Sequence, residues 1–428
     1  MSGVSGEQSD TRQESNWSRN YSYRGQVVRP DSLDAVRQLI SNSAKVGFLG
    51  SRHSFNAIAD SDVLVDMRSL PQSIEVDLDR GTATVSGGTT YGTLALELDR
   101  HGMALANFAS LPHITVAGAI ATGTHGSGTG NGGLGTSVSS LEIITAEGNS
   151  VHVKRGSPDF NGCVVGLGAL GAVVSVGIDI EPAYTVRQFV VQDVPWSTLI
   201  VELRAVMGSA YSVSLFTRWA DSVTQAWVKQ RVAGDSAPLH PALSAGRSAE
   251  RDLHPVGDLD TANCTPQLGL EGPSFDRLPH FRIGFTPSAG AELQSEFLLD
   301  WSAATEAVEA MRAIGDRIRP ALLISELRAV AADQLWMSPS YARDSLAIHF
   351  TWRPEPELVR SALTVIESVL LPLGARPHWG KVFLAGNEQL RDQYPKLDDF
   401  SALAERLDPR HAFRSGWLEQ HVFGSSQR

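Results

Sequence analysis

The chain has 428 residues, of which 42% are hydrophobic and 19% charged, with a formal net charge of -11. This length exceeds one ordinary core, so we expect two domains with the composition of a globular enzyme. The negative charge argues against binding to nucleic acid or an anionic membrane surface, and no apolar run is long enough for a membrane span.

The chain ends and the cysteines favour a cytoplasmic protein. Residues 1–14 are polar, which predicts a flexible tail, and they lack the apolar segment of a signal peptide. Cys163 and Cys264 lie among apolar or small residues, so we expect two reduced thiols. Two cysteines without paired spacing make a structural zinc site improbable, and we predict no metal.

Helices and short strands mix irregularly over the first hundred residues. Pro30-Asp31-Ser32 precedes apolar residues at helical spacing, which predicts a capped helix from Leu33. Residues 46–49 and 63–67 predict strands, residues 74–85 a hairpin and residues 91–100 a helix. This is not the regular strand–helix repeat of a doubly wound sheet.

The turn from Gly50 to Asn56 follows the first of these strands. Glycine permits a sharp turn, and His53 lies at its tip between the small residues Ser51 and Ser54. Small neighbours let a large planar ligand approach the backbone. An exposed turn histidine without any function is the ordinary alternative, so His53 alone names no chemistry.

A second stretch, Ser110 to Gly126, is rich in small residues. Its residues 116–124 could present backbone amides to a phosphate at the start of a short helix. The glycines from Gly128 to Gly133 have the letters of a dinucleotide fingerprint, but residues 138–144 after them predict a strand. A true fingerprint opens a helix, so a standard nicotinamide site is not predicted.

Polar residues on two predicted strands mark a second domain, at about 185–378. Glu326 and Arg328 are two residues apart and therefore share a strand face, as do His349 and Thr351. The two pairs could line one pocket. The alternatives are an ordinary surface ion pair and side chains that face water. The cluster from Arg376 to Lys381 is likewise either a loop ion pair or part of a site.

Together these motifs resemble the alditol oxidases of the vanillyl-alcohol-oxidase-like superfamily of FAD enzymes. The likeness runs from Asn16 nearly to the C-terminus, in the same order and with similar spacing. It implies an α+β fold of two domains: an N-terminal FAD-binding domain of the PCMH type, completed by the C-terminal segment, and a middle cap domain built on an antiparallel sheet. We predict the boundaries 1–14 (tail), 15–184 (FAD-binding domain), 185–378 (cap) and 379–428 (C-terminal segment).

The resemblance also implies the site residues. His53 would carry FAD covalently on the flavin 8α-methyl carbon, and Arg52 stands where some relatives have glycine, so its charge could alter the flavin. The implied cofactor-binding residues are Gly50, Ser51, Arg52, His53, Ser54, Phe55, Ser110, Thr115, Gly118, Ala119, Ile120, Ala121, Thr122 and His125. The implied substrate-binding residues are Ser110, Glu326, Arg328, His349, Thr351 and Lys381, with Glu326, Arg328 and Lys381 catalytic.

The implied reaction oxidises a terminal CH–OH of an alditol such as xylitol or sorbitol, with hydride transfer to flavin N5 and reduction of O2 to H2O2. Arg328 would orient the alcohol oxygen and Glu326 would hold hydroxyls and Arg328. Lys381 is the better base if burial lowers its pKa, but the sequence leaves the base open. The partners are then a polyol and O2, and we expect a monomer.

Two other functions stay open at this stage. One is a sugar-1,4-lactone oxidase or dehydrogenase of the gulono- or arabinono-lactone type, and the other is a non-redox module that binds FAD or sugars. The pairs Glu326/Arg328 and His349/Thr351 favour the alditol oxidase.

Overall fold

The computed structural model describes residues 14–234, 238–285 and 292–424. The tail predicted at residues 1–14 lies, except for Glu14, outside this range. None of the helices in the described ranges is long and apolar enough to cross a bilayer.

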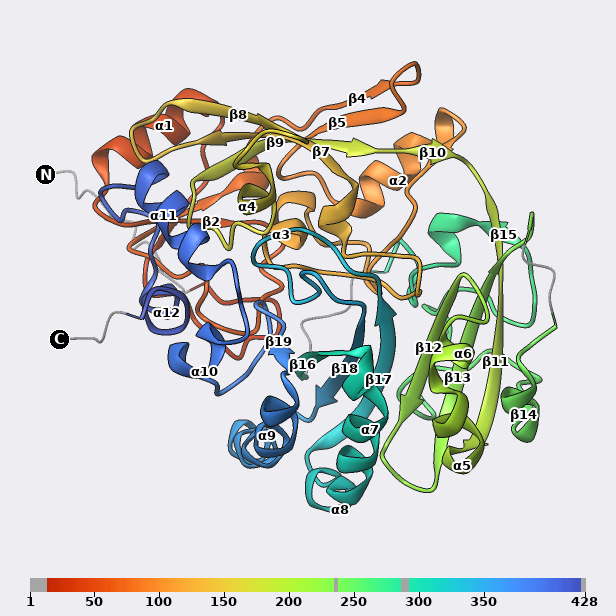
Figure 1. Cartoon of the computed structure of the whole chain (residues 1–428). Helices are drawn as coiled ribbons and strands as arrows, with labels where there is room; N and C mark the ends of the chain where they lie inside the picture. The colour runs from red at the N-terminus through yellow and green to blue at the C-terminus, as the bar shows by residue number, and fades with distance from the viewer. Residues whose placement is uncertain (1–13, 235–237, 286–291, 425–428) are drawn as a thin grey trace, which may run out of the picture.

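The N-terminal part of the chain forms two sheets (Figure 1). A parallel sheet of order β1-β3-β2 contains β1 (Gln26–Val28), β3 (Val63–Asp66) and β2 (Val46–Leu49). An antiparallel sheet of order β4-β5-β9-β7-β8 contains β4 (Ile74–Asp77), β5 (Thr82–Ser86), β9 (Ala172–Asp179), β7 (Val138–Ile144) and β8 (Ser150–Lys154). The short strands β6 (Met103–Ala104) and β10 (Glu181–Pro182) pair separately.

Helices of this part are amphipathic or short. Helix α1 (Leu33–Asn42) begins after Ser32, whose side chain accepts a hydrogen bond from the Ala35 amide, and it buries Val36 and Ile40. Thr90 caps α2 (Tyr91–Arg100) in the same way. The other two are α3 (Val116–Ala121) and α4 (Phe160–Val164).

The middle of the chain forms one nine-stranded antiparallel sheet, seen at the lower right of Figure 1. Its order is β14-β11-β13-β12-β17-β18-β16-β19, with β15 pairing at the end of β11. The strands are β11 (Thr185–Pro195), β12 (Ser212–Thr217), β13 (Ser222–Arg231), β14 (Arg247–Ser248), β15 (Gly272–Pro273), β16 (Leu293–Asp300), β17 (Leu322–Val330), β18 (Ser345–Trp352) and β19 (Arg376–Pro377).

One face of the nine-stranded sheet is apolar and the other polar. Leu215, Leu327 and Ile348 lie in register on neighbouring strands, are fully buried and belong to the main hydrophobic core. Four helices pack against the sheet: α5 (Trp196–Leu199), α6 (Leu203–Met207), α7 (Ala304–Ala313) and α9 (Pro356–Leu370). Helix α8 (Gly315–Ile318) packs against α7 and α9. The opposite face carries Glu326 opposite His349, and His349 opposite Glu296, in one row across three strands.

The C-terminal segment returns to the N-terminal part. It contains α10 (Asn387–Arg391), α11 (Leu397–Leu407) and α12 (Gly416–Leu418). The Val46 amide donates to the Ala412 carbonyl at 2.8 Å, and the Ser415 hydroxyl donates to the Ile58 carbonyl at 2.9 Å. The α+β fold, with an N-terminal part completed by this segment and a middle part built on an antiparallel sheet, is confirmed, whereas the exact domain boundaries stay a prediction.

Candidate active site

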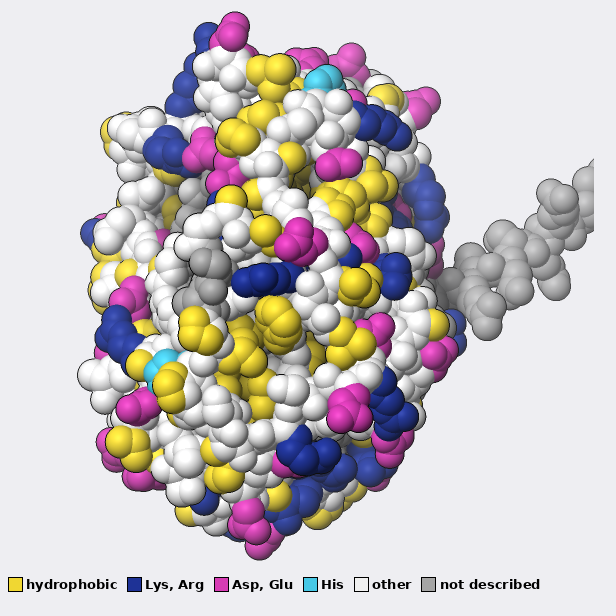
Figure 2. Space-filling model, turned by 90° about the vertical axis from the view of Figure 1, so that its right-hand side faces the viewer, with side chains coloured by type: hydrophobic (Ala, Val, Ile, Leu, Met, Phe, Trp, Pro, Cys, Tyr) yellow, Lys and Arg dark blue, Asp and Glu magenta, His cyan; other side chains and the backbone are white. Residues whose placement is uncertain are grey.

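A large pocket lies between the turn after β2 and the polar face of the nine-stranded sheet. Almost all of the predicted site residues line it, including Gly50 to Phe55, residues of α3 and Lys381. Only Ile120 does not line it, because its side chain points from α3 into the hydrophobic core and is 1% exposed. Figure 2 shows one outer face of the molecule, where hydrophobic side chains gather in and around a central hollow.

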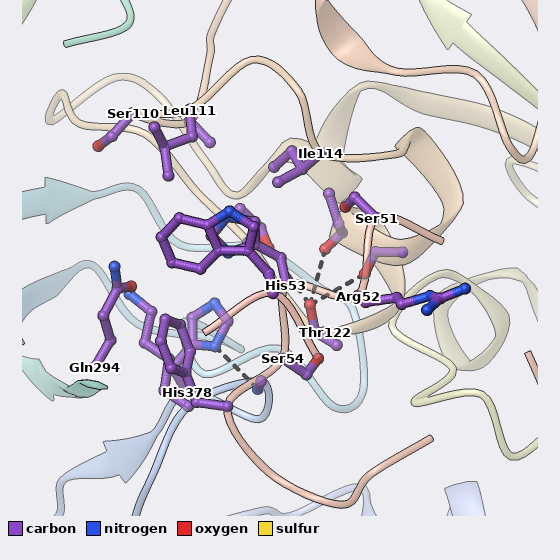
Figure 3. Close-up of a pocket in the computed structure, with 18 of the residues that line it drawn as sticks. Ser51, Arg52, His53, Ser54, Ser110, Leu111, Ile114, Thr122, Gln294 and His378 are labelled. Atoms are coloured by element: carbon purple, nitrogen blue, oxygen red, sulfur yellow. Dashed lines mark hydrogen bonds between the residues drawn. The ribbon is translucent and has the colours of Figure 1, made fainter. Parts of the chain in front are cut away.

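His53 lines this pocket at the turn after β2, and Figure 3 shows it near Ser54 and Arg52. Its ring stacks on Trp17, with ring centroids 4.2 Å apart, and is 4.9 Å from the ring of His113. Its Nε2 is buried and has no hydrogen-bond partner among the described residues. Burial lowers the pKa of His53 to about 3, so the ring is neutral at pH 7. Where the other ring nitrogen carries the proton, Nε2 of this neutral ring has a free lone pair.

Arg52 points away from His53 (Figure 3). Its guanidinium forms ion pairs with Glu14 and Asp66, the latter at 3.1 Å. The backbone of Arg52 has φ +59°, in the left-handed region that glycine adopts without strain. Glycine at this position would suit the backbone, and the charge of Arg52 is balanced by acidic side chains.

Glu296, on β16, binds both of the predicted catalytic cations. Arg328 donates from Nη2 to Oε1 of Glu296, and Lys381 donates from Nζ to Oε2 at 2.6 Å. His125 Nε2 lies 3.3 Å from Oε1. Burial raises the pKa of Glu296, but the two cations overcome this effect and hold the pKa well below its usual range. Glu296 is therefore an anion at the centre of the site.

The two cations differ in how firmly they hold their protons. Burial lowers the pKa of Lys381, and the neighbouring charge of Arg328 adds to this effect, whereas Glu296 opposes it. Arg328 is also buried, yet the carboxylates of Glu296 and Glu326 raise its pKa above the ordinary value. Arg328 is therefore a permanent cation, and Lys381 is the group that can lose its proton.

Glu326 is held by a histidine that our sequence analysis did not find. Nε2 of His280 lies 2.9 Å from Oε1 of Glu326, and Arg328 Nε lies 3.8 Å from the same oxygen. Arg328 thus forms an ion pair with Glu326, while its close hydrogen bond is to Glu296.

A further chain of polar contacts orients His349. Its Nε2 lies 3.2 Å from Oε1 of Gln294, and Gln294 Nε2 donates to Oε1 of Glu292 at 2.7 Å. An amide oxygen only accepts, so His349 carries its proton on Nε2. Thr351 lines the same pocket, two residues along β18. The surface alternatives are wrong, because Glu326, Arg328, His349 and Thr351 are all buried.

Sequence reasoning missed Glu296, His280 and Gln294, all of which line the pocket. Gln294 and Glu296 are two residues apart on one strand, which is the same signal that identified Glu326 and Arg328. Ser295 between them blurs the apolar–polar alternation. His280 lies in a loop between β15 and β16 and has no periodic signal.

Comparison with known proteins identifies the family. The FAD binding domain family matches residues 25–154, and the D-arabinono-1,4-lactone oxidase family matches residues 292–421. The chain is 43% identical to an alditol oxidase of Streptomyces sp. over 415 residues, which cover 96% of this chain and 99% of that protein. The chain belongs to the alditol oxidase family of FAD-dependent oxidoreductases.

Other relatives of this alditol oxidase family member are more distant. An L-gulono-1,4-lactone dehydrogenase of Mycobacterium tuberculosis is 27% identical, over 92% of this chain and 95% of that protein. The crystal structure of cholesterol oxidase from B. sterolicum superposes with a TM-score of 0.77 at 15% identity, over 96% of each chain, and supports the fold.

The pocket of this family member fits FAD on its own geometry. Nε2 of His53 is buried without a partner among the described residues, and His53 lines the pocket. Gly118 of α3 is exposed, and it lines the pocket together with Ala121 and Thr122. Gly50 admits no side chain, since a Cβ there would lie 2.0 Å from Oγ1 of Thr115.

Proposed function

We propose that this chain oxidises a terminal CH–OH of alditols such as xylitol or sorbitol, with FAD attached covalently through His53. The observation that carries the proposal is the cluster of Glu296, Arg328 and Lys381, which is buried on the pocket side of the cap sheet and faces the His53 turn. The 43% identity to an alditol oxidase supports the substrate class.

In this proposal the cap residues bind and orient the alditol. Arg328 keeps its charge and donates hydrogen bonds to the reacting alcohol oxygen, while Glu326 and Thr351 bind other hydroxyls of the alditol. Ser110 lines the pocket and contacts the substrate from the FAD-binding domain. Several fixed polar groups hold the reacting carbon in one position, which lowers the entropy cost of the reaction.

Lys381 accepts the proton of the alcohol in this proposal. Burial lowers the pKa of its ammonium, so the neutral amine is more accessible than that of an exposed lysine. Glu296 then stabilises the protonated lysine that results, through the contact of 2.6 Å. Bound FAD supplies the acceptor for the hydride and passes its electrons to O2, which gives H2O2.

The cofactor contacts proposed for FAD are those of the His53 turn and of α3. Residues Gly50 to Phe55 would surround the flavin, and Thr115, Gly118, Ala119, Ala121 and Thr122 would pass along the pyrophosphate. His125 is the exception, because it contacts Glu296 and so belongs with the substrate cluster. A monomeric cytoplasmic protein remains part of the proposal.

The second candidate is a sugar-1,4-lactone oxidase or dehydrogenase, which the match of residues 292–421 to the D-arabinono-1,4-lactone oxidase family supports. A peroxide assay with xylitol, sorbitol and L-gulono-1,4-lactone separates the candidates. The proposal requires turnover with at least one alditol at a kcat/KM above that for the lactone. Turnover with the lactone alone would support the second candidate and refute the first.

A further inference from the structure

A lysine is buried behind the substrate side of the pocket. Lys229 lies on β13 and is 1% exposed, although it does not line the pocket itself. It has no carboxylate within ion-pair distance among the described residues. A buried ammonium without a counter-ion is costly, and burial accordingly lowers the pKa of Lys229 to about 7.

The Nζ of Lys229 is surrounded by hydrogen-bond acceptors of one loop. It donates to the carbonyls of Leu278 and Pro279, the latter at 3.4 Å, and lies 3.3 Å from Nδ1 of His280. Both the ammonium and the neutral amine have at least two N–H donors for the two carbonyls. The direction of the contact with Nδ1 of His280 follows from the other nitrogen of that ring.

The contact with Glu326 fixes the tautomer of His280. A carboxylate only accepts, so Nε2 of His280, which lies 2.9 Å from Oε1 of Glu326, carries the proton. Nδ1 of the neutral ring then accepts, and Lys229 donates to it as the ammonium. Phe216 and Trp227 hold the ring edge-on, with centroids 5.4 and 5.2 Å from that of His280. Burial lowers the pKa of His280 to about 4, which agrees with a neutral ring.

The same loop also reaches the other side of the pocket. The backbone amide of His280 donates to the carbonyl of Ser110 at 3.2 Å. His280 therefore connects Glu326 of the cap sheet to Ser110 of the FAD-binding domain, and Lys229 sets the position of this connection.

We propose that Lys229 and His280 are positioning residues, which hold Glu326 with Oε1 occupied and Oε2 presented to a substrate hydroxyl. This inference rests on the proposed function, since Glu326 is taken to bind an alditol. Oε2 of Glu326 has no partner among the described residues, and Glu326 lines the pocket. Its anionic state follows from Arg328 and His280, which lower its pKa against the effect of burial.

The functional test is a double-mutant cycle of Lys229→Met and Glu326→Gln with xylitol as substrate. We expect Lys229→Met to raise KM about tenfold, with a smaller change in kcat. Glu326 binds a hydroxyl that does not react, so its contact stabilises the bound substrate and the transition state equally, and its loss changes KM. In the Glu326→Gln background the same change should alter KM by less than about twofold, since the two residues act as one unit. Lys154→Met, at the exposed end of β8, is the matched control.

Additive effects in the cycle, or an unchanged KM in Lys229→Met with a normal flavin content, would overturn the proposal. If Lys229→Met does not fold, a spectrum of the wild-type holoenzyme still tests the proposal. Its ¹⁵N spectrum with labelled histidine, assigned by comparison with His280→Asn, should show His280 as the Nε2–H tautomer. The Nδ1–H tautomer or a charged ring at pH 7 would refute the proposal. This spectrum requires no turnover, so it is independent of whether alditols are the substrates.

Discussion

The Nζ of Lys381 lies 2.6 Å from one carboxylate oxygen of Glu296, while the other oxygen of Glu296 binds Arg328. One buried anion thus places a permanent cation and a titratable amine side by side in the pocket. Each charged group of this cluster depends on the others, which makes single substitutions informative.

Glu296→Gln should lower kcat/KM for the best alditol by about 10²-fold, because removal of one partner from a buried ion pair costs roughly 3 kcal/mol. The flavin content should stay normal, since Glu296 lies on the cap sheet. Steady-state kinetics measure the loss, and Glu309→Gln on the exposed side of α7 is the control. Activity near that of the wild type would remove Glu296 from the site.

The pH dependence should report Lys381. A base must be neutral, so kcat/KM should rise with pH through an apparent pKa below 10.5, as burial lowers the pKa of this lysine. Lys381→Met should abolish this ascending limb and lower the rate by at least about 10²-fold. If the ascending limb of the pH profile persists in Lys381→Met, another group is the base that accepts the proton of the alcohol.

Arg52→Gly should be more stable than Arg52→Ala by about 1 kcal/mol. Both variants lose the ion pairs with Glu14 and Asp66, but only glycine adopts φ +59° without strain. Urea unfolding of the two holoenzymes measures the difference. Equal stabilities would show that the turn relaxes in the variants.

His113→Leu should make the protein more resistant to acid. Both ring nitrogens of His113 lack partners among the described residues, and burial lowers its pKa to about 4. In the unfolded chain this histidine is protonated below about pH 6.5, whereas in the folded protein it is protonated only below about pH 4. The free energy of unfolding therefore falls as the pH falls through this window. Between these pH values, the free energy of unfolding of the variant should fall by about 1 kcal/mol less per pH unit than that of the wild type, as measured by urea unfolding.

His53→Ala should yield protein whose flavin is released by acid, because no other described residue of the turn offers an unpartnered ring nitrogen. Precipitation in acid and the colour of the pellet provide the measurement. His113→Ala is the matched control, since His113 lies beside His53 and its pellet should stay yellow. Flavin that remains on the His53→Ala polypeptide would refute the attachment.

The sequence predicted most of the regular elements, because their signals are local. The cap before α1, the hairpin of β4 and β5 and the strand β18 each follow from spacing within about ten residues. Glu326 and Arg328 were also placed correctly on one strand face, since side chains alternate along a strand.

The partners of these residues follow from pairing between distant strands. Glu296 meets His349 through the pairing of β16 with β18, and Lys381 reaches Glu296 from a loop 85 residues away. Neither relation leaves a local pattern. Lys229 was missed as well, because a lysine near the end of a strand is typical of a solvent-exposed position.

Anaerobic mixing with xylitol tests the central claim most directly, because it removes O2 and follows the cofactor itself. The account predicts that the visible absorbance of the flavin is lost when xylitol or another alditol is added, and that admission of air restores it. An absorbance that stays unchanged with every alditol, or that is lost only with L-gulono-1,4-lactone, would contradict the account.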